Sequence, residues 1–415
     1  MIGLGYIGLP TALLFANEGV NVVGVDIDAT LVEKINNDKF FIEEDGLQDI
    51  LLNVRKSESF RAAISPEKSD VFLIAVPTPA NNDEWKSCDL TNVLNVIDEI
   101  VPLLEKGNSV IIESTIPPKT IEQYIEPKIT AIGFIPGKEI FIAYCPERVI
   151  PGNILHEFTY NNRIVGGMTV NCCEKVTDFY RLVVKGKILT TDTKTAEMVK
   201  LMENVYRDVN ISLANECFKI CHELGINVLD VIKLANEHPR VHLHYPGAGV
   251  GGHCLAIDPY FVISEVPETA KLLRLSRYIN ESMPDFVIDV VRQMIKKYNG
   301  SKIAILGVSY KGNIADTRES PALEIYNKLK QLGRYEIAVY DPYVDMDFVS
   351  KNINSVLKNA SLALILAEHD EFKTMTNQHF SAMKQRVVFD TKHMLENRTD
   401  NIEYIHFGNL HKFKF

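Results

Sequence analysis

The chain has 415 residues, which is too long for one ordinary hydrophobic core and indicates two or three domains. Hydrophobic residues make up 46% of the chain and charged residues 24%, as in a typical globular protein. The formal net charge of -10 argues against a surface for nucleic acid or for anionic membranes. An anionic substrate must therefore be held by a few local cations.

The seven cysteines have no regular spacing and form no CxxC pair. This usage indicates reduced cysteines in a cytoplasmic protein and gives no zinc signature, so we expect no bound metal. The sequence has no secretory signal peptide and no apolar run near 18 residues, so we expect no membrane association.

A glycine-rich turn opens the chain at residues 3–8, and only the end of the strand that should precede it is present. We expect this shortened strand to affect stability rather than chemistry. A helix of apolar spacing follows from Pro10 to Glu18, and then a short buried strand from Asn21 to Asp26. Further strand-like runs, separated by helical stretches, predict a doubly wound parallel sheet. These runs are Val71–Val76, Ser109–Ile112, Ile140–Ala143 and Arg163–Val165.

The pattern changes at Thr193, where apolar residues begin to recur at three- and four-residue steps as far as Leu224. This spacing predicts one long helix that Gly225 stops, followed by a second helix that Asn227 caps. A second α/β pattern starts at Lys302. Its expected elements are the strands Lys302–Leu306, Glu336–Tyr340, Leu362–Leu366 and Val387–Phe389 and the helix Ser320–Leu332.

These elements predict an α/β protein with two doubly wound Rossmann-like domains joined by a long central helix and a helical linker domain. The expected domains are residues 1–190, residues 191–295 and residues 296–415. The length of the helical middle domain suits a homodimer interface.

The opening turn fits the dinucleotide fingerprint GxGxxG. Gly3 makes the turn, Gly5 lets the backbone approach a pyrophosphate, and Gly8 packs the following helix on the strand. Asp26 lies at a strand end, where its carboxylate can bind a ribose 2′-hydroxyl and repel a 2′-phosphate. The turn therefore favours NAD over NADP; the alternative is a tight turn without a nucleotide.

A stretch rich in glycine, Pro246 to Cys254, carries the strongest candidate nucleophile. Glycines leave room for a substrate beside Cys254, and Asp258, four residues on, can orient or deprotonate water. The alternative is that Cys254 is a small buried hydrophobe. The loop by itself favours neither interpretation.

Several other polar residues are candidates for the site, and each also has a purely structural interpretation. Lys200 and Asn204 project from one face of the long helix, where they can stabilise an oxyanion or form a solvated face. Glu147 follows a strand end and is either a general base or part of a loop salt bridge. Thr115 also follows a strand-like run.

A polar cluster precedes the cysteine loop and suits binding of phosphate or sugar better than binding of metal. It consists of His238, Arg240, His242 and His244. In the last domain, Lys311 and Arg318 flank the loop after the first strand. They can neutralise a diphosphate or be ordinary surface charges.

Seven motifs occur in order along the chain, namely GLGYIGLP, AVPTP, ESTI, CPER, Lys200-x-x-Glu203-Asn204, GVGGHC and YKGNIADTRES. Their order resembles the UDP-glucose/GDP-mannose dehydrogenase family over essentially the whole chain. Within this family the sequence is most similar to members that oxidise UDP-N-acetyl-D-mannosamine for capsule and surface polysaccharides.

The resemblance implies an NAD-dependent dehydrogenase with a UDP-sugar substrate, in which the first domain binds NAD and the last binds the UDP-sugar. Arg240 is the candidate for an arginine that reaches the site of a neighbouring subunit. The implied catalytic residues are Cys254, Lys200, Asn204, Glu147, Asp258 and Thr115. The implied cofactor-binding residues are Gly3, Gly5, Tyr6, Ile7, Gly8, Asp26, Pro77, Thr78, Thr115 and Arg318. The implied substrate-binding residues are Arg148, Val149, Lys200, Asn204, Arg240, His242, Tyr245, Gly251, Tyr310 and Lys311.

The family chemistry oxidises an alcohol to a carboxylate, which removes four electrons and needs two NAD molecules. A cysteine thiolate holds the aldehyde as a thiohemiacetal, which then becomes a thioester. The alternatives are oxidation of UDP-N-acetylglucosamine or UDP-glucose, a two-electron β-hydroxyacid dehydrogenase, and a non-catalytic nucleotide-sugar sensor. The β-hydroxyacid dehydrogenases lack both the GGxC loop and a second Rossmann-like domain.

Overall fold

The structure is a computed structural model that describes residues 1–37, 39, 42, 44–150, 152–395 and 401–413. The chain divides into two compact units, Met1–Glu203 and Asn204–Phe415, and the division falls inside one long helix. Each unit has its own sheet and its own hydrophobic core.

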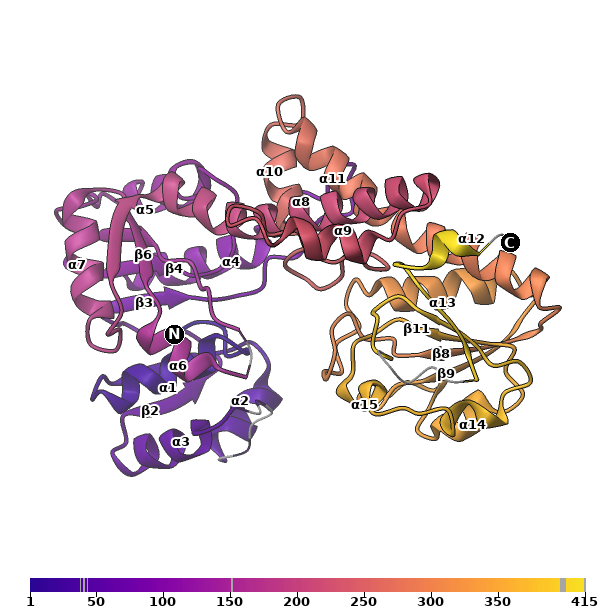
Figure 1. Ribbon diagram of the computed structural model, residues 1–415. Helices are drawn as coiled ribbons and strands as arrows, with labels where there is room; N and C mark the ends of the chain where they lie inside the picture. Colours follow the sequence, from indigo (N-terminus) through magenta and orange to yellow (C-terminus); the bar gives the residue numbers. More distant parts are fainter. Residues whose placement is uncertain (38, 40–41, 43, 151, 396–400, 414–415) are drawn as a thin grey trace. The chain divides into compact units, whose positions relative to one another are not determined.

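The first unit is built on a largely parallel sheet (Figure 1). Ile2 pairs with Val25 on one side and with Ile74 on the other, so it joins the two-stranded and five-stranded parts. All other pairings are parallel except the one between β5 and β6. The strand order is β2 (Phe60–Ala63), β1 (Val22–Val25), Ile2, β3 (Val71–Ile74), β4 (Ser109–Ile112), β5 (Phe141–Tyr144), β6 (Arg163–Gly167) and β7 (Ile188–Asp192).

Helices cover both faces of this sheet, which explains why its central strands are apolar at successive positions. Phe72 and Ile74 of β3 pack in one hydrophobic cluster with Ile97, whereas Leu73 packs in another with Phe15. The helices of this unit are α1 (Gly8–Asn17), α2 (Ala29–Asn36), α3 (Leu47–Lys56), α4 (Thr91–Ile100), a π-helical turn (Ile121–Ile125), α5 (Glu126–Thr130), α6 (Ile154–Tyr160) and α7 (Val170–Tyr180).

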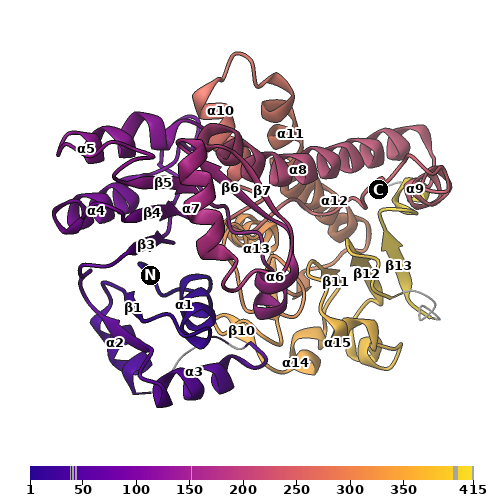
Figure 2. The same cartoon turned by 90° about the vertical axis from the view of Figure 1, so that its left-hand side faces the viewer.

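The long helix α8 (Thr193–Leu224) contributes residues to both units (Figure 2). It ends at Gly225, whose φ of +75° leaves the helical region, and the Asn227 side chain then accepts a hydrogen bond from the Leu229 amide to cap the next helix. The other helices of the helical region are α9 (Val228–Ala235), α10 (Asp258–Glu265), α11 (Lys271–Glu281) and α12 (Met283–Lys297).

The second unit contains a fully parallel six-stranded sheet with the order of a Rossmann fold. Figure 2 shows β11, β12 and β13 side by side. Along β8, Ile303 and Ile305 pack with α12 and α13, and Ala304 and Leu306 pack in a separate cluster with α14 residues. The order is β10 (Val349–Ser350), β9 (Glu336–Tyr340), β8 (Lys302–Leu306), β11 (Leu362–Ile365), β12 (Val387–Asp390) and β13 (Glu403–His406), and the helices are α13 (Pro321–Gln331), α14 (Ile353–Leu357) and α15 (Asp370–Lys373).

The α/β class with two Rossmann-like sheets and a long helix is confirmed. The strands expected at Ser109–Ile112, Lys302–Leu306 and Glu336–Tyr340 and the helix at Thr193–Leu224 have the expected bounds. The strand expected at Arg163–Val165 is present as β6, but its antiparallel pairing was not predicted, nor were the strands β2, β7, β10 and β13. Within the described part of the chain, no helix combines the length and the apolarity that a membrane crossing requires.

Candidate active site

The glycine-rich turn of the first unit has the geometry of a dinucleotide-binding loop. Gly3 has φ of +90°, and a Cβ there would lie 2.5 Å from the Ala75 carbonyl oxygen. A Cβ on Gly8 would overlap the Gly3 carbonyl oxygen at the start of α1. Apart from Gly5 itself and its two chain neighbours, no described residue has an atom within 4 Å of the Cβ position of Gly5. Gly3 and Gly8 are thus required by packing, whereas Gly5 leaves open space of the kind that a dinucleotide-binding loop offers to a pyrophosphate.

The remaining residues of this turn lie where a nucleotide can reach them. Tyr6 is exposed and Ile7 is half-buried, directly before α1. Asp26 follows β1 and accepts hydrogen bonds from the Leu4 and Asp28 amides, at 2.9 and 3.0 Å. A carboxylate offers about four lone-pair sites, so Asp26 can still accept from a ribose diol. The residues present therefore fit NAD.

The loops after β3 and β4 are bonded to each other beside this turn. The Thr78 hydroxyl donates to the Thr115 carbonyl oxygen at 2.7 Å, and the Ser114 hydroxyl donates to the Val76 carbonyl oxygen at 2.8 Å. The Asn92 side chain donates to the Pro77 carbonyl oxygen at 2.9 Å. Because carboxyl ends of parallel strands are where α/β proteins bind ligands, Pro77, Thr78 and Thr115 lie in a suitable place for cofactor contacts.

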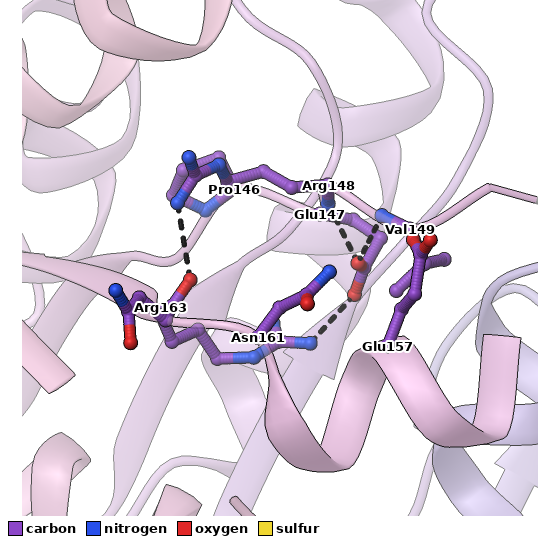
Figure 3. A pocket seen from close by; sticks show the side chains of 8 residues that line it. Pro146, Glu147, Arg148, Val149, Glu157, Asn161 and Arg163 are labelled. Atoms are coloured by element: carbon purple, nitrogen blue, oxygen red, sulfur yellow. Dashed lines mark hydrogen bonds and ion pairs between the residues drawn. The ribbon is translucent and has the colours of Figure 1, made fainter. Parts of the chain in front are cut away.

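Glu147 follows β5 and is buried among hydrogen-bond donors (Figure 3). Its carboxylate accepts from the Arg148 and Val149 amides, at 2.6 and 2.9 Å, and from the Arg163 guanidinium at 2.8 Å. The Lys200 ammonium donates to the Glu147 carbonyl oxygen at 2.6 Å. In this arrangement Glu147 shapes its loop and places Lys200, and its carboxylate is occupied by three donors.

Arg148 is held by a bidentate ion pair with Glu203, one helical turn beyond Lys200 on α8. Its guanidinium also donates to the Asn162 carbonyl oxygen at 3.0 Å. The cavity between Pro146, Val149 and Asn161 measures about 10 Å³, which is room for about one water and not for a sugar.

A buried cluster beneath this loop was missed by the sequence analysis. The Arg163 guanidinium lies between the carboxylates of Glu147 and Glu113 and over the Phe158 ring, and the Tyr180 hydroxyl donates to Glu113 at 2.6 Å. Burial raises the pKa of Glu113 to about 7, against the opposing effect of Arg163. The only signal in the sequence was an arginine at the start of an otherwise apolar strand.

In the second unit, Cys254 lies in the turn that leads into α10. The Cys254 carbonyl oxygen accepts from the Asp258 amide at 2.8 Å, and its side chain is half-buried. Asp258 is buried at the first position of α10, and its carboxylate accepts from the Asn204 side chain at 2.6 Å. Three of the predicted residues, Cys254, Asp258 and Asn204, are therefore brought together within one unit.

The glycines before Cys254 pack against the loop after β8. A Cβ on Gly251 would lie 2.6 Å from the Glu319 carbonyl oxygen, and one on Gly252 would lie 2.8 Å from the Tyr310 ring. The Gly252 amide donates to the Arg318 carbonyl oxygen at 3.0 Å. Only glycine lets these two loops approach so closely.

This contact also connects charges. The Arg318 guanidinium pairs with Asp316, which raises the pKa of Arg318, and Cys254 contributes in the same direction. Burial raises the pKa of Tyr310, and the neighbouring Asp316 and Cys254 act in the same direction. The Lys311 side chain is exposed beside them. Tyr310 and Arg318 thus lie within electrostatic reach of Cys254.

The polar segment ahead of the cysteine loop is mostly exposed. Arg240, His242 and Tyr245 are all exposed. The Arg240 backbone amide donates a hydrogen bond to the His238 ring at 3.3 Å. These three residues are not brought onto Cys254 by any contact described in the structure. Over the described residues, no group of three or more His, Cys, Asp or Glu side chains is arranged to hold a metal ion.

A dinucleotide-binding turn in one unit and a cysteine loop in the other define the class of NAD-dependent dehydrogenases. Three sequence profiles narrow the class: the NAD-binding, central and UDP-binding domains of the UDP-glucose/GDP-mannose dehydrogenase family match residues 1–184, 194–282 and 304–397. The chain belongs to this family, and NAD is its cofactor.

Individual relatives cover nearly the whole chain. A Methanocaldococcus jannaschii protein named UDP-N-acetyl-D-mannosamine dehydrogenase is 47% identical over 401 residues, 95% of this chain and 92% of the relative. A Ralstonia solanacearum protein named NDP-N-acetyl-D-galactosaminuronic acid dehydrogenase is 40% identical, with 95% of each chain covered. The native structure of the UDP-N-acetyl-mannosamine dehydrogenase Cap5O from Staphylococcus aureus is 50% identical, covers 99% of this chain and 98% of that chain, and has a TM-score of 0.92.

Proposed function

We propose that this enzyme oxidises UDP-N-acetyl-D-mannosamine at C6 to the uronate, with two NAD molecules and a covalent intermediate on Cys254. Relatives named for this substrate are 47% identical in sequence and 50% identical among the solved structures. The observation that carries the chemistry is the group formed by Cys254, Asp258 and Asn204 in the second unit. On the family resemblance alone, we assign the product to capsule or surface polysaccharide synthesis. On the cysteine usage alone, we assign the enzyme to the cytoplasm.

The reaction balances as one alcohol, two NAD and one water giving one carboxylate, two NADH and three protons. NAD, when bound at the opening turn, accepts a hydride in each of the two oxidations. After the first, the Cys254 thiolate adds to the aldehyde carbon and gives a thiohemiacetal. Loss of the second hydride gives a thioester, and water cleaves the carbon–sulfur bond and returns the thiol.

The charged and polar residues have distinct roles in this proposal. Lys200 and Asn204 stabilise the oxyanions that form at C6. Asp258, whose carboxylate is fixed by Asn204, directs the hydrolytic water. Glu147 acts by shaping its loop and placing the Lys200 ammonium, and Thr115 takes part in ordering the cofactor or the water.

The last domain and the segment before the cysteine loop supply the substrate contacts. The UDP-binding family profile covers this domain, and Tyr310 and Lys311 lie on its loop after β8. We assign Tyr245, Gly251 and Lys311 to the UDP portion, and Arg318 to the cofactor side. The domains proposed for these tasks are residues 1–190, 191–295 and 296–415.

We also propose that the enzyme is a homo-oligomer, most simply a dimer. Helix α11 buries Ser276, Arg277 and Asn280 and exposes Leu272, Leu275 and Tyr278, of which Tyr278 is 71% exposed. A helix that exposes its apolar side supports burial against another chain. Further exposed apolar residues lie along α8, among them Tyr206, Leu213, Ile220 and Leu224. Arg240 is the candidate to act in the partner's site.

The substrate is tested with the purified enzyme, NAD and a panel of UDP-N-acetylmannosamine, UDP-N-acetylglucosamine, UDP-N-acetylgalactosamine, UDP-glucose and GDP-mannose. We expect the highest kcat/KM with UDP-N-acetylmannosamine. The galactosamine sugar is included because of the Ralstonia relative. A higher kcat/KM with any other sugar would replace the proposed substrate, and no NADH with any of them would favour a sensor.

A further inference from the structure

A chain of buried polar side chains runs from the core of the second unit to the cysteine loop. The Gly247 amide donates to the Asn215 side-chain oxygen at 2.9 Å, and the Asn215 amide group donates to the Asn280 side-chain oxygen at 2.9 Å. The Asn280 amide group donates to the Asp208 carboxylate at 2.8 Å, and Arg277 donates to the same oxygen at 2.7 Å. All four side chains are at most 3% exposed.

Each hydrogen bond in this chain has a fixed direction. A backbone amide can only donate, so Asn215 must present its oxygen to Gly247 and its amide group to Asn280. An ionised carboxylate can only accept, so Asn280 must present its amide group to Asp208. No side-chain amide can rotate by itself without placing two like groups against each other. The hydrogen-bond network therefore specifies one arrangement of these side chains. Loss of one hydrogen bond weakens the orientation of the next residue in the network.

The loop that receives this chain needs such anchors. Four of the eight residues from Gly247 to Cys254 are glycines, and glycine loses more conformational entropy on ordering than any other residue. Two hydrogen bonds in the second unit anchor the loop: Asn215 accepts from the Gly247 amide, and the Arg318 carbonyl oxygen accepts from the Gly252 amide. In addition, a Cβ on Gly249 would lie 3.4 Å from the Asn280 carbonyl oxygen. The loop therefore contacts the backbone of Asn280 as well as the side chain of Asn215.

We propose that Asn215 is a positioning residue, which acts through Gly247 to set where the cysteine loop presents the Cys254 thiol. Asn280, Asp208 and Arg277 hold Asn215 in the required orientation. Asn215, Asp208 and Asn204 lie on the same helix α8, and Asn204 bonds Asp258, so one helix fixes the loop before Cys254 and the acid after it. The inference rests on the proposed role of Cys254, and the test separates the two.

The main variant is Asn215→Leu, which keeps the approximate shape and removes both hydrogen bonds. We expect kcat to fall at least tenfold, while the Kd for NAD stays within twofold because the NAD turn lies in the first unit. Because the loop moves, we also expect the rate at which iodoacetamide alkylates Cys254, followed by mass spectrometry of its peptide, to change at least threefold. A purely structural role would lower stability and leave this alkylation rate unchanged.

The matched control is Lys219→Met, one turn further along α8. Lys219 donates to the Ser282 hydroxyl at 2.7 Å, so it also joins α8 to the end of α11, but it has no hydrogen bond to the cysteine loop in the described residues. We expect its kcat and its Cys254 alkylation rate to stay within twofold of the native values. A large loss in this control would show that any link between α8 and α11 suffices, and would overturn the proposal.

A second variant, Asn280→Ala, leaves the bond between Asn215 and Gly247 but removes the support behind it. We expect kcat of Asn280→Ala to fall about threefold. This variant keeps the proposal testable if Asn215→Leu does not fold. Folded variants with native kcat and native alkylation would overturn the proposal. Because alkylation needs no turnover, it reports on the loop even if Cys254→Ser shows that the proposed covalent chemistry is wrong.

Discussion

The molecule contains the same strand-to-loop turn twice, once in each unit. In the first, the Gly3 amide donates to the Val25 carbonyl oxygen at 2.8 Å and the Leu4 amide donates to Asp26 at 2.9 Å. In the second, the Gly307 amide donates to the Tyr340 carbonyl oxygen at 2.8 Å and the Val308 amide donates to the Asp341 carboxylate at 2.8 Å. Both leading glycines have positive φ, +90° and +86°.

The surroundings of the two acids differ. Asp26 is partly exposed, and the turn beside it is open at Gly5. Asp341 is fully buried and accepts a hydrogen bond from the His369 ring at 3.1 Å, and Ser309, which corresponds to Gly5, is buried with its hydroxyl 3.3 Å from the same ring. The segment after β11 therefore fills the space that the first turn leaves open. The first turn has room for a dinucleotide, whereas the second is filled and supports the loop that carries Tyr310 and Lys311.

The comparison predicts different costs for the same change in the two turns. Asp341→Asn removes the charge that strengthens the buried hydrogen bonds from His369 and the Val308 amide, and should lower the free energy of unfolding by about 3 kcal/mol. Asp26→Asn weakens one part-buried and one exposed hydrogen bond, and should cost less than about 1 kcal/mol. Urea unfolding of both variants measures the difference, and equal losses would contradict the comparison.

The buried turn at Asp341 should also make the free energy of unfolding depend on pH. Hydrogen bonds from His369 and from backbone amides outweigh burial and lower the pKa of Asp341 from 3.8 to about 2. A lowered pKa means that this stabilisation is present above pH 3.8 and is lost as the pH falls through about 2. The difference in unfolding free energy between the native protein and Asp341→Asn should shrink by about 2 kcal/mol over this range. A difference that stays constant from pH 5 to pH 2 would contradict it.

The open turn should instead affect the cofactor. Asp26→Asn loses a charge-assisted hydrogen bond to the ribose and should weaken NAD binding about tenfold, which corresponds to about 1.4 kcal/mol. Fluorescence titration with NAD measures the Kd. The control is Asp28→Asn, in which the acid two residues on caps α2 and should leave the Kd unchanged. If both variants bind NAD alike, Asp26 does not contact the ribose.

The sequence predicted the parts of the fold that local patterns define. Alternating strands and helices, the glycine turn and the long periodic helix appear as expected because each depends on neighbouring residues. The strand β6 was expected, but its antiparallel pairing with β5 was not, because direction depends on how distant segments meet. The strand β7 was missed because Ile188–Asp192 is only partly buried and lacks the apolar run of a central strand.

The site was predictable where a motif carries it and not where buried partners hold it. The sequence indicated Cys254, Asp258 and Asn204, and the structure places them together. The sequence analysis did not identify Arg163 or Asn215 as part of a site, because their partners are distant in sequence; Asn280, the partner of Asn215, lies 65 residues away. The available signal was a set of polar residues on the buried side of helices, as with Arg277 and Asn280 on α11.

The central claim is a four-electron oxidation through Cys254, and the most direct test is the yield of NADH and acid per UDP-sugar consumed. The account predicts two NADH and one uronate for the native enzyme. For Cys254→Ser it predicts loss of steady-state uronate formation, with NAD binding unchanged. One NADH per sugar for the native enzyme, or normal uronate formation by Cys254→Ser, would contradict the covalent mechanism.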